Sequence, residues 1–87
     1  MRSEPTPSLE QRLLAVLADG TPRTHVELAA AVGVHRIGVK DAIERLTRRG
    51  QVTQAGGKVV RVSSGAQQWL PLWALTPEGL AALRADA

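Results

Sequence analysis

Hydrophobic residues recur every three to four positions in three stretches of the first half of the chain. This spacing places them on one face of a helix, so we predict helices at about residues 9–18, 25–32 and 36–49. The residues expected to point inward and form the core are Leu13, Leu14, Val16 and Leu17 in the first helix, Leu28, Ala29 and Val32 in the second, and Val39, Ala42, Ile43 and Leu46 in the third.

Two of these helices are expected to begin with a capping box. Ser8 precedes Gln11 by three residues, and Thr24 precedes Glu27 by three. In this motif the hydroxyl group and the later side chain satisfy free backbone amides at a helix start. The second helix should end at Gly33, because glycine tolerates the left-handed conformation of a tight turn. A short helix, a turn and a second helix in this order indicate a helix-turn-helix.

After Gly50 the pattern changes from helical to extended. Gly56 and Gly57 can supply the positive φ angles of a tight hairpin turn, so strands are expected on both sides of them. A last short helix should begin at Thr76-Pro77, a capping residue followed by proline at the first helical position. The expected extended runs are residues 51–54, 58–63 and 69–75, with a loop at residues 64–68 before the third.

This order of elements predicts a mainly α protein with a small antiparallel β-wing. The fold is then a winged helix-turn-helix with a three-helix core, a wing of two or three strands and a short C-terminal helix. We expect this domain to span residues 8–87. Residues 1–7 are polar and contain two prolines, so we expect them to be a disordered leader. The 87 residues can bury one core, and we expect them to be a complete small protein.

The residue types required for several other functions are missing or scattered. The chain has no cysteine, which excludes a disulfide framework and a thiolate metal site. It has no signal-peptide pattern and no apolar run long enough to span a bilayer. His25 and His35 lie on different elements, and no spacing suits a metal site or a nucleophile. We therefore expect no enzyme activity, no cofactor, no metal, no membrane contact, and a cytoplasmic, nucleoid-associated location.

Positive charge is concentrated in the third predicted helix. Residues 35–49 carry a net charge of +3, whereas the rest of the chain is neutral. Such a concentration suits a polyanionic partner, because lysine and arginine neutralise phosphates and release counterions. The alternative is a solvated helix with ion pairs between residues four positions apart. Those pairs would be Lys40–Glu44, Asp41–Arg45 and Glu44–Arg48, and they leave Arg36 and Arg49 without an acidic neighbour.

Three stretches of the chain resemble the winged helix-turn-helix of MarR-like bacterial transcriptional regulators. They are ELAAAVGV for the second helix and the turn, VKDAIERLTRRGQV for the third helix and the start of the wing, and WALTPEGLAAL for the end of the wing and the last helix. Together the matching stretches and their spacing cover residues 8–85. The resemblance implies that the third helix enters the major groove of DNA and that the wing lies along the adjacent backbone or minor groove.

On this basis the third helix is the expected DNA-reading element. Its outward side carries Arg36, Ile37, Lys40, Asp41 and Glu44, and the first four of these are predicted DNA-contacting residues. We expect Arg36 and Lys40 to contact base edges or nearby phosphates, and Ile37 to make an apolar contact such as one with a thymine methyl group. Gly38 either lets the backbone approach the DNA groove or avoids a clash with the second helix. The residues expected to meet the DNA backbone are Arg45, Arg48, Arg49, Lys58 and Arg61.

The third extended run is apolar on both faces, and a small wing can bury only one of them. Trp73 and Leu75 lie next to the last helix and are expected in the core. Trp69, Leu70 and Leu72 then mark a candidate dimer or partner surface. The alternative is that the last helix folds back over Leu70 and Leu72.

The expected function is sequence-specific binding of double-stranded DNA by a small bacterial or phage transcriptional regulator. A single small module seldom gives enough affinity alone, so we expect a homodimer. In so small a core we expect no small-molecule effector. The alternative function is that of a winged helix used as a protein-interaction module without DNA binding, because a fold does not dictate a function.

Overall fold

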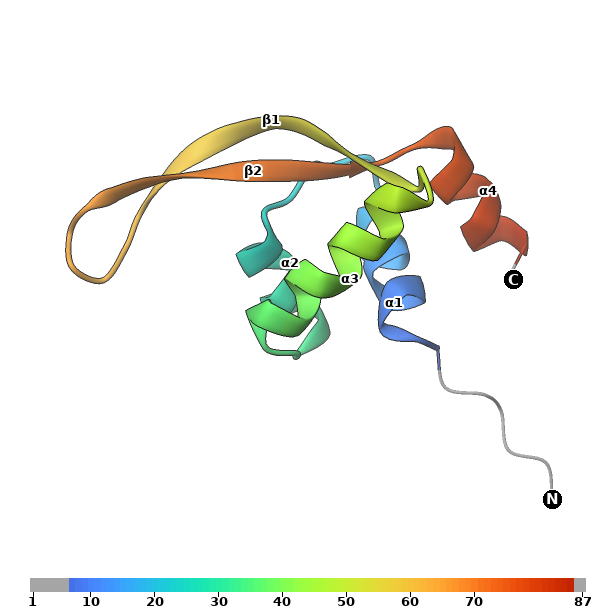
Figure 1. Cartoon of the computed structure of the whole chain (residues 1–87), viewed down its shortest axis with the longest axis horizontal. Coiled ribbons are helices and arrows are strands. Elements are labelled where there is room, and N and C mark those ends of the chain that lie inside the picture. The colour runs from blue at the N-terminus through green and yellow to red at the C-terminus, as the bar shows by residue number, and fades with distance from the viewer. Residues whose placement is uncertain (1–6, 86–87) are drawn as a thin grey trace, which may run out of the picture.

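A computed structural model describes residues 7–85, in which a helical body carries a two-stranded antiparallel hairpin (Figure 1). This arrangement confirms the predicted fold class. The expected disordered leader, apart from Pro7, lies outside the described residues, as do residues 86–87. No helix within residues 7–85 has both the length and the apolar character needed to cross a membrane. The elements are α1 (Leu9–Leu17), α2 (His25–Val32), α3 (Arg36–Arg48), β1 (Val52–Arg61), β2 (Gln67–Leu75) and α4 (Pro77–Ala85).

Both predicted capping boxes are present. Ser8 Oγ accepts a hydrogen bond from the Gln11 amide at 3.2 Å, and Gln11 Oε1 accepts one from the Ser8 amide at 2.8 Å. At the start of α2, Thr24 Oγ1 accepts from the Glu27 amide at 3.1 Å, and Glu27 Oε1 accepts from the Thr24 amide at 2.8 Å. Each box provides hydrogen-bond acceptors for backbone amides at the helix start, which have no carbonyl partner within the helix. Contacts between residues three positions apart therefore fix where α1 and α2 begin.

The predicted turn at Gly33 joins α2 to α3. Gly33 has a left-handed backbone with a φ of 70°. The amides of Gly33 and Val34 both donate to the Ala29 carbonyl oxygen, at 2.9 and 3.2 Å. The Val32 carbonyl oxygen accepts a hydrogen bond from the guanidinium group of Arg12 in α1. Helix α1 therefore holds the turn in place, and with it the start of α3.

The first three helices pack their apolar faces together to form the core. Of the eleven inward residues predicted for them, nine are buried, and Val16 and Ala29 are half-buried against the others. Val52 at the start of β1 is also buried. Trp73 and Leu75 of β2 pack against the core as predicted. Helical periodicity therefore identified the interior of the body correctly, because each helix buries one face against the other two.

The wing differs from the prediction, which placed a hairpin turn at Gly56-Gly57 and separate extended runs on either side. Instead, the single strand β1 passes through both glycines. The chain reverses direction only between Val62 and Ala66, where the Val62 amide donates to the Ala66 carbonyl oxygen at 2.9 Å. Gly65 supplies the left-handed residue of this turn, with a φ of 87°. The wing therefore has two long strands, and the expected three-run arrangement was wrong.

A β-bulge interrupts β1 at Ala55 and Gly56. Between the pairs Gln54–Trp73 and Gly57–Pro71, β1 contains two residues where β2 contains one. Gly56, with a φ of 81°, takes the left-handed conformation that such a bulge accepts. Beyond the bulge the strands continue to pair, so a positive φ at this position bends the hairpin rather than ending it. The dipeptide alone does not distinguish the two outcomes, which explains the wrong prediction.

Gly57 also makes room for Trp69. A Cβ atom at Gly57 would lie 2.2 Å from the Trp69 ring, so the indole lies directly over this glycine. Trp69 is paired in register with Val59 on the opposite strand. Their side chains remain 56% and 60% exposed. This cross-strand pair therefore stabilises the hairpin outside the core.

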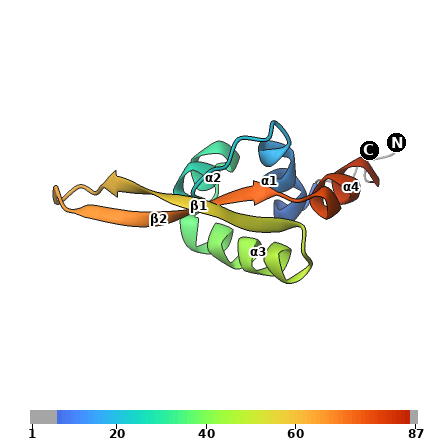
Figure 2. The same ribbon diagram turned by 90° about the horizontal axis from the view of Figure 1, so that it is seen from above.

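The helical body fixes the base of the hairpin through one further backbone pairing. The Arg23 amide donates to the Trp73 carbonyl oxygen at 3.0 Å, and the Trp73 amide donates to the Arg23 carbonyl oxygen at 2.8 Å. Arg23 lies between α1 and α2, so this antiparallel bridge ties β2 to the body. The hairpin then crosses the body and projects past it (Figure 2).

Helix α4 begins as predicted at Thr76-Pro77 and lies close to the segment between α3 and β1. Thr76 Oγ1 accepts a hydrogen bond from the Gly79 amide at 3.0 Å and donates one to the Gly50 carbonyl oxygen at 2.6 Å. Gly79 is buried, and a Cβ atom there would lie 2.1 Å from the Gln51 carbonyl oxygen. The absence of a side chain at Gly79 is therefore a packing requirement.

We predict that Gly79→Ala lowers the free energy of unfolding by about 1–3 kcal/mol, because its methyl group would overlap the Gln51 carbonyl oxygen. Gly38→Ala is the matched control within another helix. A Cβ atom there meets only Val34 Cγ1, at 3.5 Å, so this change should raise the free energy of unfolding by about 0.5–1 kcal/mol. Denaturant unfolding followed by circular dichroism measures both. Equal effects of the two substitutions would contradict the close contact at Gly79.

Candidate nucleic-acid interface

A groove of about 1110 Å³ lies between the start of α2, one side of α3 and the hairpin. Its helical wall carries polar and charged side chains from α2 and α3, and its other wall is formed by the two strands. The predicted site residues that line it are Arg36, Ile37, Lys40, Arg48, Lys58 and Arg61.

The structure brings six of the nine predicted DNA-contacting residues together in this groove and leaves three outside it. Arg36 and Lys40 are exposed, and the Ile37 side chain is 64% exposed. Asp41, Arg45 and Arg49 do not line the groove. The buried stripe of α3 causes this division, because burying one face of the helix decides which of its other side chains point towards the hairpin.

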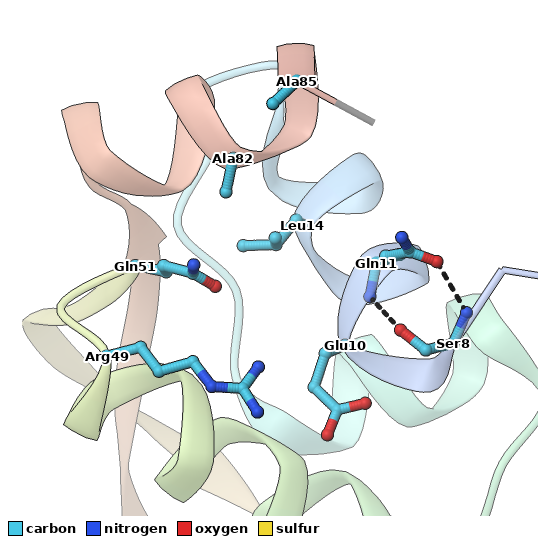
Figure 3. A pocket seen from close by; sticks show the side chains of 8 residues that line it. All are labelled: Ser8, Glu10, Gln11, Leu14, Arg49, Gln51, Ala82 and Ala85. Atoms are coloured by element: carbon cyan, nitrogen blue, oxygen red, sulfur yellow. Dashed lines mark hydrogen bonds between the residues drawn. The ribbon is translucent and has the colours of Figure 1, made fainter. Parts of the chain in front are cut away.

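Arg45 of α3 and Arg49, the residue that follows the helix, lie on the side that faces α1. Arg45 Nε contacts Glu10 Oε1 of α1 at 2.7 Å. This hydrogen bond from Arg45 is the main reason that the pKa of Glu10 lies below its ordinary value. Arg49 lines a smaller hollow of about 370 Å³ between α1 and α4. Figure 3 shows the Arg49 guanidinium group pointing towards Glu10 across this hollow.

Fewer ion pairs form within α3 than the alternative of a solvated, ion-paired helix predicts. Of the three expected pairs within α3, Glu44–Arg48 is formed, with Arg48 Nη2 and Glu44 Oε1 2.5 Å apart. Arg45 binds Glu10 instead of Asp41. Within residues 7–85, Arg36 and Lys40 make no ion pair. Two cations at the start of α3 are therefore available to a partner.

An ion pair connects the wing to the start of α2. Lys58 Nζ of β1 lies 2.9 Å from Glu27 Oε2. The other carboxylate oxygen of Glu27 accepts the capping hydrogen bond from the Thr24 amide. This backbone hydrogen bond, followed by the contact with Lys58, lowers the pKa of Glu27 below its ordinary value. One carboxylate thus caps a helix and positions the hairpin beside it.

His25 is a groove residue that sequence reasoning did not identify. It is the first residue of α2, it is half-buried, and it lines the groove together with Arg36 and Lys40. Burial is the main reason that its pKa lies below the ordinary histidine value, and the positive charges of Lys40 and Arg36 lower it further. No local spacing signals this cluster, because α2 and α3 bring it together only when they pack.

His35, the other histidine, has a separate role. It precedes α3, and its Nδ1 accepts a hydrogen bond from the Ile37 amide at 3.2 Å. The imidazole thus caps the helix in the way that a serine or asparagine side chain usually does. His35 therefore positions the start of α3 and does not line the groove.

The three apolar wing residues expected at a partner surface divide between two places. Leu70 is half-buried and lines the groove, opposite Lys58 in the hairpin register. Trp69 and Leu72 do not line the groove. Helix α4 lies at the end of the hairpin away from its turn (Figure 1). Leu72 is half-buried as well, so Trp69 is the exposed member of the three predicted surface residues.

Comparison with known proteins bears on the fold. No family model and no curated protein matches the chain. A probable transcriptional regulator from Pseudomonas aeruginosa is 22% identical, with a TM-score of 0.70 over 92% of this chain and 55% of its own. A MarR-family regulator from Silicibacter pomeroyi is 19% identical, with a TM-score of 0.67 over 88% and 47%. The PcaV transcriptional regulator from Streptomyces coelicolor is 29% identical, with a TM-score of 0.65 over 94% and 53%.

The chain has the winged helix-turn-helix fold of MarR-type regulators. This winged-helix domain spans about half the length of the solved structures it matches. Helices α2 and α3 form the helix-turn-helix, and the hairpin is the wing. Within residues 7–85 of the domain, no three histidine or acidic side chains lie close enough together to hold a metal ion.

We predict that Glu27→Gln lowers the free energy of unfolding at neutral pH by about 0.2–1 kcal/mol, the usual range for an exposed ion pair. Glutamine can still cap α2 but cannot pair with Lys58. Because the pKa of Glu27 is depressed in the folded state, its stabilising contribution is complete above the unfolded-state pKa and is lost as the pH falls through the folded-state value. Chemical unfolding at a series of pH values should show wild type and variant converging in acid.

The double variant Glu27→Gln/Lys58→Gln serves as the control, because it removes both partners of the ion pair. It should be no less stable at neutral pH than the sum of the two single variants predicts. A stability difference between wild type and Glu27→Gln that persists unchanged in acid would contradict this account.

Proposed function

We propose that this winged-helix domain binds double-stranded DNA in a sequence-specific manner and acts in a small bacterial or phage transcriptional regulator. The observation that carries the proposal is the exposed start of α3. There, Arg36 and Lys40 make no ion pair within residues 7–85, and Ile37 is exposed between them. Unpaired cations on an exposed helix are suited to the phosphate-flanked major groove, which admits an α-helix.

In this proposal, α3 enters the major groove with its first turns. Arg36 and Lys40 contact base edges or nearby phosphates, and Ile37 contacts an apolar group such as a thymine methyl. Gly38 lies between these residues, and a Cβ atom there would meet only Val34 Cγ1 at an ordinary contact distance of 3.5 Å. Packing against α2 therefore does not require glycine at this position. Gly38 itself does not line the groove, so close approach of DNA to the helix backbone at this position stays a prediction.

The remaining cations act on the DNA backbone in two ways. Arg48, Lys58 and Arg61 line the groove, where they can reach phosphates beside α3 on the side of the hairpin. Arg45 and Arg49 lie outside it, so they contribute mainly to the long-range attraction of the polyanion. Asp41 also lies outside the groove and is exposed on the same helix.

The structural neighbours support this proposal, because those proteins are described as transcriptional regulators. PcaV was solved in complex with its natural ligand, so ligand binding occurs in a protein with this fold. Our expectation that the present domain takes no small-molecule effector remains a prediction, as does the cytoplasmic, nucleoid-associated location. We also propose a homodimer, because two modules supply the affinity that one seldom provides.

One observation favours the alternative of a protein-interaction module. Trp69 and Val59 form an exposed apolar pair outside the groove. Salt dependence distinguishes the two functions. A DNA binder loses affinity steeply with salt, by about 0.9 logarithmic units per contact neutralised for each tenfold increase. A protein-interaction module should bind duplex DNA weakly at every ionic strength.

We predict that Arg36→Ala weakens binding to a preferred duplex by about 1–3 kcal/mol, the discrimination given by one good base contact. Lys40→Ala should also weaken binding. If it removes a phosphate contact, the plot of the logarithm of the binding constant against the logarithm of the salt concentration should become less steep by about 0.9. Selection from a random duplex library provides the preferred sequence. Fluorescence anisotropy on this duplex and on a random one then measures affinity and specificity.

Arg84→Ala is the matched control, because Arg84 is an exposed cation on α4 that does not line the groove. It should bind DNA as the wild type does. Wild-type affinity in both Arg36→Ala and Lys40→Ala would show that the start of α3 is not the contact surface.

We predict that Leu72→Lys disrupts the proposed homodimer, because a charged group on a subunit contact surface must be desolvated. Light scattering should then give half the wild-type mass. Leu70→Lys is the comparison variant: its side chain lies in the groove, so it should leave the mass unchanged. A monomeric wild type, or a Leu72→Lys protein of unchanged mass, would rule out this interface.

A further inference from the structure

The groove contains more positive charge than its own carboxylates balance. It is lined by five lysine and arginine side chains and by two carboxylates, those of Glu27 and Glu44. Both carboxylates are already occupied, because Glu27 pairs with Lys58 and Glu44 pairs with Arg48. Arg36, Lys40 and Arg61 make no ion pair within residues 7–85. The groove therefore lacks negative charge that a bound phosphate backbone would supply.

His25 lies in this groove with the uncompensated cations. Along α2, the charged group beside it is Glu27. Across the groove it is faced by α3, whose charged groups there are Arg36, Lys40, Glu44 and Arg48, and by β1, which carries Lys58 and Arg61. Because neither carboxylate is free, no acidic group within the described part of the groove is available to pair with an imidazolium ion at this position.

We infer that binding of double-stranded DNA is coupled to uptake of a proton by His25, so that the affinity of the groove for DNA increases as the pH falls. This inference rests on the proposed function. In the free protein, a proton on His25 would add a further unpaired cation beside Arg36 and Lys40. Phosphates of bound DNA remove this repulsion and offer the imidazolium an opposite charge.

The direction of the coupling follows from linkage. Burial and the two neighbouring cations hold the pKa of His25 below its ordinary value in the free protein. Adding phosphates raises this pKa. Between the pKa of His25 in the free protein and its pKa in the complex, the complex therefore holds more protons than the free protein. In this pH range the affinity for DNA rises as the pH decreases. Histidine is the side chain whose ordinary pKa falls in the neutral range, so this coupling acts near physiological pH.

The test measures the Kd for a fluorescein-labelled duplex, obtained by selection from a random library, at constant ionic strength between pH 6 and pH 8. For the wild type we expect affinity about threefold to tenfold higher at pH 6, the gain from partial uptake of one proton. His25→Gln should lose the gain in acid, so that its Kd changes little between pH 8 and pH 6. His25→Arg carries a fixed charge and should bind tightly at both pH values.

His35→Ser is the matched control, because serine can also cap α3 and does not titrate. It should retain the pH dependence of the wild type. NMR titration of the histidine ring protons provides a second readout, in which the His25 pKa should rise when duplex is added. Circular dichroism at each pH value confirms that every variant is folded.

The possible results separate this inference from the proposed function. Salt-dependent binding with the same Kd at pH 6 and pH 8, or equal pH dependence in wild type and His25→Gln, would overturn the proton coupling alone. An unchanged His25 pKa on adding duplex would do the same. Absence of duplex binding at every pH and ionic strength would overturn the proposed function and the coupling together.

Discussion

The packing of α3 against α1 and α2 is the interaction on which the rest of the structure depends. Val39, Ala42, Ile43 and Leu46 are at most 3% exposed, and burial of each larger side chain contributes about 1.5–3 kcal/mol. Because these residues occupy one stripe of a rigid helix, their burial also fixes the direction of every other side chain on α3. Arg36 consequently faces the groove.

Within the described part of the chain, ion pairs occupy some of the cations of α3 and the wing and leave others free for a partner. Glu10 of α1 binds Arg45, and Glu27 of α2 binds Lys58. These contacts join segments that are distant in the chain, so they help to orient α3 on α1 and the hairpin on α2. Arg36 and Lys40 have no such partner within residues 7–85. The start of α3, beside His25, therefore keeps two unbalanced positive charges.

The wing contains two adjacent glycines in β1, yet several contacts hold its shape. At its base, Arg23 and Trp73 pair through two backbone hydrogen bonds. Farther out, the bulge at Gly56 bends β1, and the Trp69 ring lies over Gly57. The Arg23–Trp73 bridge fixes the base of the hairpin on the helical body, whereas the bulge and the Trp69–Gly57 contact shape the hairpin itself. The groove between wing and helix thus follows from backbone geometry as well as from side-chain charge.

The sequence by itself determined the features that depend on neighbours within about four residues: the capping boxes, the turn at Gly33 and the buried helix stripes. It also located the surplus charge on α3 and six of the residues that line the groove. Only the tertiary structure decided that Gly56 lies in a bulge and not in the hairpin turn, that Arg45 pairs with α1, and that His25 joins the groove. Such outcomes depend on which distant segments meet, and a local pattern carries no information about the partner across a strand or between helices.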